Sequence, residues 1–236
     1  MVVITGDSWG VGEYNDQALI HGPGIASYIT HCIPCTNLCR GGGSNTDALD
    51  RLEHFLSNYS PEQDDTFLWI VTAPNRCIIN LDIFLKDTKS IEGSLKNILI
   101  TSLQRANTLA IAHNIRLKLI GGLCDLTDID QLPFSNLDFV VPSWCSLLKA
   151  EYTTSILEQD FISNIGPVIK NNFPWLLNNW LNLADISARK NLDWQSMKTT
   201  YFKTDGLHPD RSGHMVLLKT VFPDLVRYFE IYDISN

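Results

Sequence analysis

The stretch Met1-Val2-Val3-Ile4-Thr5-Gly6-Asp7-Ser8-Trp9 decides how the rest of the sequence is interpreted. Its apolar part, residues 2–5, predicts a short strand. Gly6-Asp7-Ser8 has the composition of a turn, so the chain is expected to bend as the strand ends. Ser8 therefore comes directly after the tip of a predicted strand, where its hydroxyl group can be presented at the edge of a sheet.

Short apolar runs alternate with longer amphipathic stretches along the chain, which is typical of a parallel sheet covered by helices. Strands are predicted at residues 2–5, 35–40, 67–71, 116–120 and 139–141. Helices are predicted at residues 24–31, 45–59, 91–113 and 212–230, with Ser212 as the N-cap of the last helix. This order predicts an α/β fold.

The composition limits the class of protein. The chain has 236 residues, of which 44% are hydrophobic, so we expect one domain over residues 1–236. The formal net charge of −8 argues against a nucleic-acid partner, because phosphates require clustered Lys and Arg. We expect no membrane span and no signal peptide, although a mature form that had lost its leader would look the same.

The cysteines do not form a recognisable metal or redox motif. Cys32-Ile33-Pro34-Cys35 has the CxxC spacing, and Cys39 lies nearby. A zinc site needs further ligands with matching spacing, and a redox CxxC begins a helix, whereas this one follows a predicted helix. We expect scattered reduced thiols and no bound metal. Reduced cysteines favour a cytoplasmic protein.

A second motif, Asp205-Gly206-Leu207-His208-Pro209, precedes the last predicted helix. A serine hydroxyl is a poor nucleophile unless a base removes its proton, and a histidine can serve as that base. Ser8 would be the nucleophile, His208 the general base, and Asp205 the group that orients the imidazole. Taken alone, each motif is an ordinary turn sequence, so the assignment depends on their being brought together.

The positions of the predicted strand ends explain how Ser8 and the motif of Asp205 and His208 are expected to come together. Ser8, Gly41-Gly42-Gly43 and Thr72-Ala73-Pro74-Asn75 each follow a predicted strand. The carboxyl ends of parallel strands meet at one edge of the sheet, where loops form a crevice. Asp205 and His208 precede a helix and can fold over the same edge. The sequence thus predicts an active site there.

At these residues the chain resembles the SGNH hydrolases, also called the GDSL esterase and lipase family. Gly6-Asp7-Ser8 matches the family's GDS motif, and Asp205 with His208 matches its DxxH motif. The resemblance implies a three-layer α/β/α sandwich, flavodoxin-like, with a mostly parallel five-stranded sheet. It also implies ester hydrolysis without a metal or organic cofactor.

Two further blocks of the family concern the oxyanion hole, to which the amide of Ser8 also contributes. The segment that contains Gly42 and Gly43 is similar to the second block, and its spacing to Arg51 favours Gly42 as an amide donor, with Gly43 the close alternative. The third block departs from the family pattern GxND, because Pro74 stands at the position of the asparagine. Asn75, one residue later, is the candidate for the third donor, and Thr72 or a water is the alternative.

Aromatic residues suggest where a substrate could lie. Trp9 and Gly43 are expected to line the pocket beside Ser8. A helical, aromatic-rich insertion is expected at about residues 150–200, in which segment 171–183 carries Phe173, Trp175 and Trp180. That segment is either a helical hairpin packed on the body of the protein or an aromatic platform for a sugar or acyl group.

The sequence therefore predicts a serine ester hydrolase that works through an acyl-enzyme on a small-molecule or carbohydrate ester, with acetyl esters on carbohydrate favoured. Two alternatives remain. An acyltransferase would use the same triad and pass the acyl group to a sugar hydroxyl. A catalytically silent carbohydrate-binding module would keep the pocket, and the altered third block makes it conceivable. The sequence carries no signal for the oligomeric state.

Overall fold

The computed structural model of the chain describes residues 1–11, 13–14, 21–22, 25–74, 88–122, 124–127, 129, 131–151 and 209–228. Contacts divide the chain into two compact units, one of Met1–Val11 with Ile33–Pro142 and one of Gly12–Cys32 with Ser143–Asn236. The single domain expected over residues 1–236 stays a prediction. Apart from residues 150–151, the expected aromatic-rich insertion lies outside the described residues.

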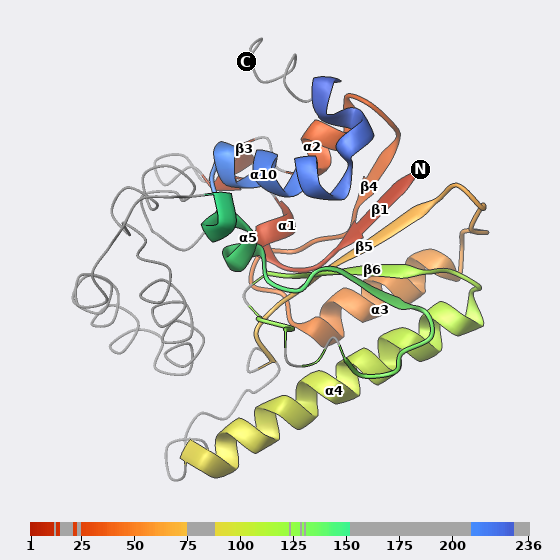
Figure 1. Ribbon diagram of the computed structural model, residues 1–236. Coiled ribbons are helices and arrows are strands. Elements are labelled where there is room, and N and C mark those ends of the chain that lie inside the picture. The colour runs from red at the N-terminus through yellow and green to blue at the C-terminus, as the bar shows by residue number, and fades with distance from the viewer. Residues whose placement is uncertain are drawn as a thin grey trace, which may run out of the picture. The chain divides into compact units, whose positions relative to one another are not determined.

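A five-stranded sheet forms the centre of the first unit, with the strand order β4-β1-β5-β6-β7 (Figure 1). Its strands are β4 (Cys35–Asn37), β1 (Val2–Thr5), β5 (Thr66–Val71), β6 (Leu117–Gly121) and β7 (Leu137–Val141). Every neighbouring pair is parallel. The predicted α/β fold and the flavodoxin-like strand order are confirmed, and the sheet, expected to be mostly parallel, is wholly so.

Burial and local hydrogen bonds explain the strand bounds. Residues 67–71 of β5 are at most 1% exposed, as a central strand covered on both faces requires. The strand predicted at residues 35–40 ends at Asn37 instead, where the side chain of Asn37 accepts a hydrogen bond from the amide of Cys39 at 2.9 Å. This turn ends the regular strand, although the amides of Leu38 and Arg40 still donate to the carbonyls of Ile4 and Gly6.

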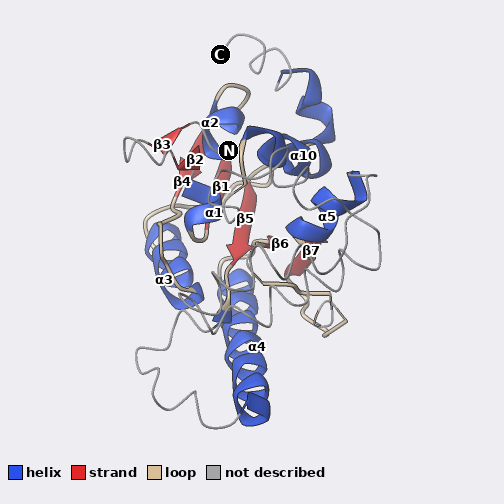
Figure 2. Cartoon of the chain, turned by 90° about the vertical axis from the view of Figure 1, so that its left-hand side faces the viewer, coloured by secondary structure: helices blue, strands red, loops and turns tan. Residues whose placement is uncertain are grey.

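Helices α3 (Asn45–Leu56) and α4 (Thr88–Ala112) pack together against the sheet of this unit (Figure 2). The apolar stripe of α3 joins residues of α4 and the strands in one core; the α3 members are Ala48, Leu49, Leu52 and Leu56. On the surface, Arg105 of α4 makes ion pairs of 2.6 Å with Asp50 and Glu53 of α3. The two helices are therefore joined by apolar packing and by charge.

Side chains set both ends of α3. Ser44 is the N-cap and forms a capping box with Asp47, whose pKa is lowered by its hydrogen bonds to Ser44. The helix was predicted to reach residue 59 but ends at Leu56. Beyond it, the amide of Asn58 donates to the carbonyl of Phe55 at 3.0 Å. The side chain of Asn58 donates to the carbonyl of His54 at 2.8 Å and so replaces the hydrogen bond that a further helical turn would make there.

The second unit contains helices α2 (Ile25–Thr30), α5 (Trp144–Glu151) and α10 (Arg211–Val221), the 3-10 helix η4 (Pro223–Leu225), and a hairpin of β2 (Glu13–Tyr14) and β3 (His21–Gly22). The hairpin was not predicted, because its strands have only two residues each. The indole N–H of Trp144 donates to the carbonyl of Gly213 at 3.1 Å, which joins α5 to α10.

Two predictions for the last helix were wrong. Its N-cap is Asp210 rather than Ser212, because the carboxylate of Asp210 accepts a hydrogen bond from the amide of Gly213 at 3.0 Å. The helix also ends at Val221 instead of continuing to residue 230. Pro223 explains this end, since proline has no N–H group to donate and disfavours helical geometry in the residue before it.

The turn after β1 depends on Gly6. Its φ angle is 152°, and a Cβ atom at this position would lie 2.7 Å from the carbonyl oxygen of Ile70 in β5. Residues other than glycine rarely adopt this backbone conformation, and a Cβ atom has no room so close to the carbonyl oxygen. Position 6 therefore requires glycine for two reasons. This turn carries the chain from the end of β1 into α1.

We expect Gly6→Ala to lower the free energy of unfolding by more than about 2 kcal/mol, because backbone strain and a steric clash add. Gly42→Ala is the matched control. Its φ of 70° is also unfavourable for alanine, but no atom lies within 4 Å of the added Cβ, so the expected loss is about 1 kcal/mol. Guanidinium unfolding measures both variants, and equal losses would contradict a role for the contact with Ile70.

Candidate functional site

Ser8 lies at the carboxyl end of the sheet. It is the first residue of α1 (Ser8–Val11), which begins just after β1. In the sheet, β4 lies on one side of β1 and β5 lies on the other. After β1 the chain therefore adds the strand on one side first and the strand on the other side next. Ligands bind to sheets of this class at such a switch point, outside the carboxyl ends of the strands. The predicted nucleophile therefore occupies the expected place.

Asp7 organises the turn that carries Ser8. Its side chain is 0% exposed. One carboxylate oxygen accepts a hydrogen bond from the amide of Trp9 at 3.0 Å, and the main-chain carbonyl of Asp7 accepts one from the amide of Gly10 at 3.1 Å. The other carboxylate oxygen accepts a hydrogen bond from the hydroxyl of Thr72 at 2.6 Å. Asp7 thus starts α1 and joins the tip of β1 to the tip of β5.

Asn45 holds the tip of β5 from the other side. It is the first residue of α3 and is 1% exposed. The amide of Thr72 donates to Oδ1 of Asn45 at 2.9 Å, while Nδ2 of Asn45 donates to the carbonyl of Thr72 at 2.8 Å. The N–H and the hydroxyl of Thr72 are its only donors, and both are now committed. Thr72 therefore has no donor left for a ligand.

Arg51 fixes the ends of β1 and β4 relative to each other. Its guanidinium donates to the carbonyl of Gly6 at 2.9 Å through Nη2 and to the carbonyl of Leu38 at 2.5 Å through Nε. The amide of Arg40 also donates to the carbonyl of Gly6, at 3.2 Å. A planar guanidinium with several donors is suited to hold two backbone segments at once.

The two glycines weighed as oxyanion donors differ in what their amides do. The amide of Gly43 donates to the carbonyl of Arg40 at 3.0 Å and closes a turn. Gly42 has a φ of 70°, and the space where a side chain would begin is open, with no atom within 4 Å. Gly43 is buried, whereas Gly42 is exposed at the same strand end. Of the two, Gly42 is the one that solvent reaches.

The remaining predicted site residues are only partly described. Trp9 is 1% exposed, and its ring lies 3.6 Å from the point where a Cβ on Gly122 would stand. This places the ring in the interior beside the end of β6, and its contact with a substrate stays a prediction. Asn75, Asp205 and His208 lie outside the described residues, and so does segment 171–183. Their roles remain predictions.

Cys32, Cys39 and Cys124 are free thiols. The sulfur of Cys39 packs against Gly10, whose added Cβ would lie 2.3 Å from it. Burial raises the pKa of Cys39 well above its usual range, and the negative charge of Asp7 raises it further. Burial likewise raises the pKa of Cys124 to about 12. Within the described residues, no group of three His, Cys, Asp or Glu side chains is placed to hold a metal ion.

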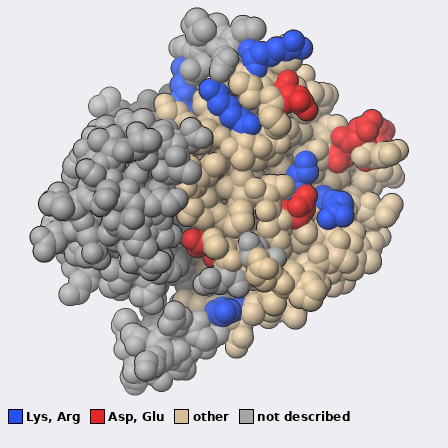
Figure 3. All heavy atoms as spheres, viewed as in Figure 1, with Lys and Arg blue, Asp and Glu red and all other residues tan. Residues whose placement is uncertain are grey.

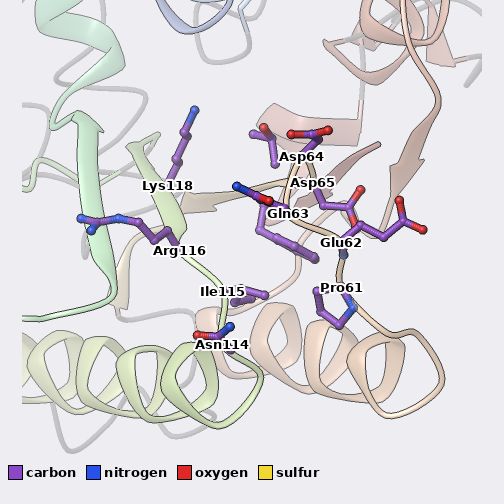
Figure 4. A pocket seen from close by; sticks show the side chains of 11 residues that line it. Pro61, Glu62, Gln63, Asp64, Asp65, Asn114, Ile115, Arg116 and Lys118 are labelled. Carbon is purple, nitrogen blue, oxygen red and sulfur yellow. Dashed lines mark hydrogen bonds between the residues drawn. The ribbon is translucent and has the colours of Figure 1, made fainter.

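A cavity of about 580 Å³ lies at the opposite edge of the sheet, where β5 and β6 begin. Figure 4 shows Arg116 and Lys118 on one side of it and Glu62 and Asp64 on the other. The complete lining is Pro61, Glu62, Gln63, Asp64, Asp65, Thr66, Phe67, Asn114, Ile115, Arg116 and Lys118. This lining contains neither serine nor histidine, and the cavity is remote from the strand end that carries Ser8.

The described surface carries both kinds of charge. On the face in Figure 3, Lys and Arg side chains lie among Asp and Glu side chains, and neither kind covers that face. Among the helices described, none combines the length and the apolar character needed to cross a membrane.

Comparisons with known proteins give a distant structural likeness. No protein-family model matches the chain, and no curated protein matches its sequence. A solved structure that resembles it is that of protein YxiM from Bacillus subtilis, with a TM-score of 0.43 and 15% sequence identity. The alignment covers 96% of this chain and 56% of that protein, so the chain spans little more than half of its length. A likeness this distant carries no argument about function.

Three residues around Ser8 make contacts that the sequence did not predict. Asp7 was noted only as part of the GDS motif, and Arg51 only for its spacing. Asn45 was expected as the first residue of a helix, which is confirmed, and the S-x-x-D pattern of Ser44 and Asp47 marks the same helix start. Nothing in the sequence pairs Asn45 with Thr72.

Replacing Thr72 with valine keeps the shape of the side chain and removes the hydroxyl that donates to Asp7. We expect Thr72→Val to lower the free energy of unfolding by about 1.5–3 kcal/mol, because a buried carboxylate loses a hydrogen bond. Thr72→Ser keeps the hydroxyl and should lose only about 1 kcal/mol, for one methyl group. Urea unfolding followed by tryptophan fluorescence compares them. If Thr72→Val is as stable as Thr72→Ser, the hydrogen bond does not stabilise the fold.

Proposed function

We propose that this protein hydrolyses carboxylic esters through an acyl-enzyme formed on Ser8. The observation that carries the proposal is the place of Ser8 at the carboxyl end of β1, between β4 and β5, as the first residue of α1. The turn around it is held by a buried carboxylate and by glycine at position 6. A nucleophile on a turn held by such contacts is suited to attack a bound carbonyl group.

In the proposed mechanism, His208 accepts the proton of the Ser8 hydroxyl as the oxygen attacks the ester carbonyl. Asp205 orients the imidazole and stabilises its charged form. His208 then protonates the leaving alcohol and activates the water that releases the acyl group. No metal or organic cofactor takes part in these steps.

The oxyanion would be stabilised by the amides of Ser8 and Gly42, with Asn75 as the third donor. Three hydrogen bonds support this choice of donors. The amide of Gly43 is used in the turn to Arg40, which favours Gly42, and both donors of Thr72 are used by Asn45 and Asp7, which favours Asn75. Pro74 cannot donate, because proline has no N–H group.

The substrate class we favour is a small acyl ester, with acetyl groups on carbohydrate first. An acyltransferase would share the first half of the reaction and differ only in its acceptor, a sugar hydroxyl in place of water. Assays of acetylated saccharides with and without a free sugar acceptor distinguish the two, because transfer yields a new acetylated sugar whereas hydrolysis releases acetate.

A fluorophosphonate probe tests the nucleophile directly, because it reacts with activated serines. We expect it to label Ser8 in the wild type, as located by peptide mass spectrometry, and to block the hydrolysis of nitrophenyl acetate. Ser8→Ala should lose labelling and nearly all turnover, while its unfolding midpoint stays close to that of the wild type. Ser60→Ala, which changes an exposed serine, should behave as the wild type.

Two results would contradict the proposal. A folded wild type that is neither labelled nor active would favour the silent carbohydrate-binding module. A Ser8→Ala variant that keeps more than about 5% of the turnover would remove Ser8 from the reaction.

The pH dependence of turnover tests His208 as the base. Neutral imidazole accepts the proton, so activity should rise with pH, with a midpoint between about 6 and 8. His208→Ala should be inactive, and the double variant Ser8→Ala with His208→Ala should be no worse than either single variant, because the members of one catalytic unit are not additive. His54→Gln alters an exposed histidine on α3 and should keep the wild-type profile. A flat profile in the wild type would exclude histidine as the base.

A further inference from the structure

The main-chain N–H and carbonyl groups of Thr72 are hydrogen-bonded to a side chain. In a strand, such groups would be bonded to the neighbouring strand. Thr72 follows the last residue of β5 and is 1% exposed, so its N–H and carbonyl groups both need partners. The amide of Asn45 meets both, at 2.9 Å and 2.8 Å. Only one orientation of that amide can accept from the N–H and donate to the carbonyl. Asn45 therefore acts like a peptide group that extends the sheet by one residue.

The backbone of Asn45 is itself fixed. It lies between the two members of the capping box, in which the amide of Asp47 donates to the hydroxyl of Ser44 at 3.1 Å and the amide of Ser44 donates to the carboxylate of Asp47 at 3.0 Å. The same short segment contains Gly42, just before the helix. Asn45 thus joins the segment of one proposed oxyanion donor, Gly42, to the strand end that leads to another, Asn75.

We propose that Asn45 is a positioning residue for the oxyanion hole: its double hydrogen bond to Thr72 holds the segment that contains Gly42 against the end of β5. This inference rests on the proposed ester hydrolysis. Asn45 touches neither substrate nor oxyanion in this scheme and acts through Thr72. On the far side, the hydroxyl of Thr72 is bound to Asp7, so the same contact also fixes the turn that carries Ser8.

The first test is Asn45→Ala, with nitrophenyl acetate as the substrate. Misplaced donors weaken the binding of charge that develops in the transition state, whereas the binding of the uncharged ester is affected less. We therefore expect kcat to fall about ten- to a hundred-fold and KM to change by less than about three-fold. Turnover is expressed per serine labelled by the fluorophosphonate, well below the unfolding midpoint of each variant, so that unfolded protein does not count.

Asn136→Ala is the matched control for stability. Nδ2 of Asn136 also donates to a backbone carbonyl, that of Ile115, at 2.9 Å. Asn136 directly precedes β7 and so lies at the opposite edge of the sheet from Ser8. This variant should lower the unfolding midpoint and leave kcat per labelled serine unchanged. A similar fall in kcat would mean that general destabilisation explains the effect of Asn45→Ala, and it would overturn the inference.

Asn45→Asp gives a second readout, the pH dependence of kcat per labelled serine. A loss of stability alone does not change this dependence. An ionised carboxylate can accept from the N–H of Thr72 but faces its carbonyl oxygen, whereas the protonated form can accept and donate as asparagine does. Burial favours the neutral form and raises the pKa of such a group. The ratio of kcat in Asn45→Asp to kcat in the wild type should therefore rise as the pH falls from about 8 to about 5.5. Taking the ratio cancels the titration of His208.

The outcomes separate the two proposals. A wild type without labelling and hydrolysis contradicts the proposed function, and the positioning role falls with it. If the wild type is labelled and active but both Asn45 variants keep the wild-type kcat per labelled serine, only the positioning role is wrong. A ratio for Asn45→Asp that does not change with pH, beside an impaired Asn45→Ala, would also contradict the double hydrogen bond as its cause.

Discussion

The burial of the Asp7 carboxylate is the constraint on which this end of the sheet depends. A charged group without contact with water is costly unless hydrogen bonds surround it. Asp7 finds them in the amide of Trp9 and the hydroxyl of Thr72, which belong to different strand tips. Both hydrogen bonds to the Asp7 carboxylate can form only when the ends of β1 and β5 lie side by side. The geometry around Ser8 follows from that requirement.

A continuous set of polar contacts spreads this constraint to a third strand tip. Asp7 is hydrogen-bonded to Thr72, and Thr72 is hydrogen-bonded to Asn45 at the start of α3. From the same helix, Arg51 donates to carbonyl groups at the ends of β1 and β4. Buried networks of this kind define one arrangement when every member has its partners. Helix α3 therefore has two functions in this unit: its apolar stripe covers the sheet, and its polar residues set the loops at one edge.

The fold was predictable because its signals are local, whereas the contacts around Ser8 are not. The buried run of β5 and the GDS turn after β1 can be read from neighbouring residues, and both lie where they were expected. The pairing of Asn45 with Thr72 joins positions far apart in the chain, so no periodicity records it. The ends of β4 and α10 were predicted wrongly for a different reason. The turn at Asn37 and the effect of Pro223 are local, but the apolar periodicity from which the elements were predicted does not record them. The predicted partners of Ser8 at positions 205 and 208 remain predictions.

The position of β1 between β4 and β5 also affects how the chain acquires its structure during synthesis. Val2 forms its ladder with Cys35 on one side and Thr66 on the other, so β1 is made long before either neighbour. At about 5–20 residues per second, the apolar strand waits several seconds for β5. Parallel pairing offers no hairpin that could protect it earlier. The strand that presents Ser8 in the finished protein is thus an exposed apolar segment in the nascent chain, the kind of segment that chaperones bind.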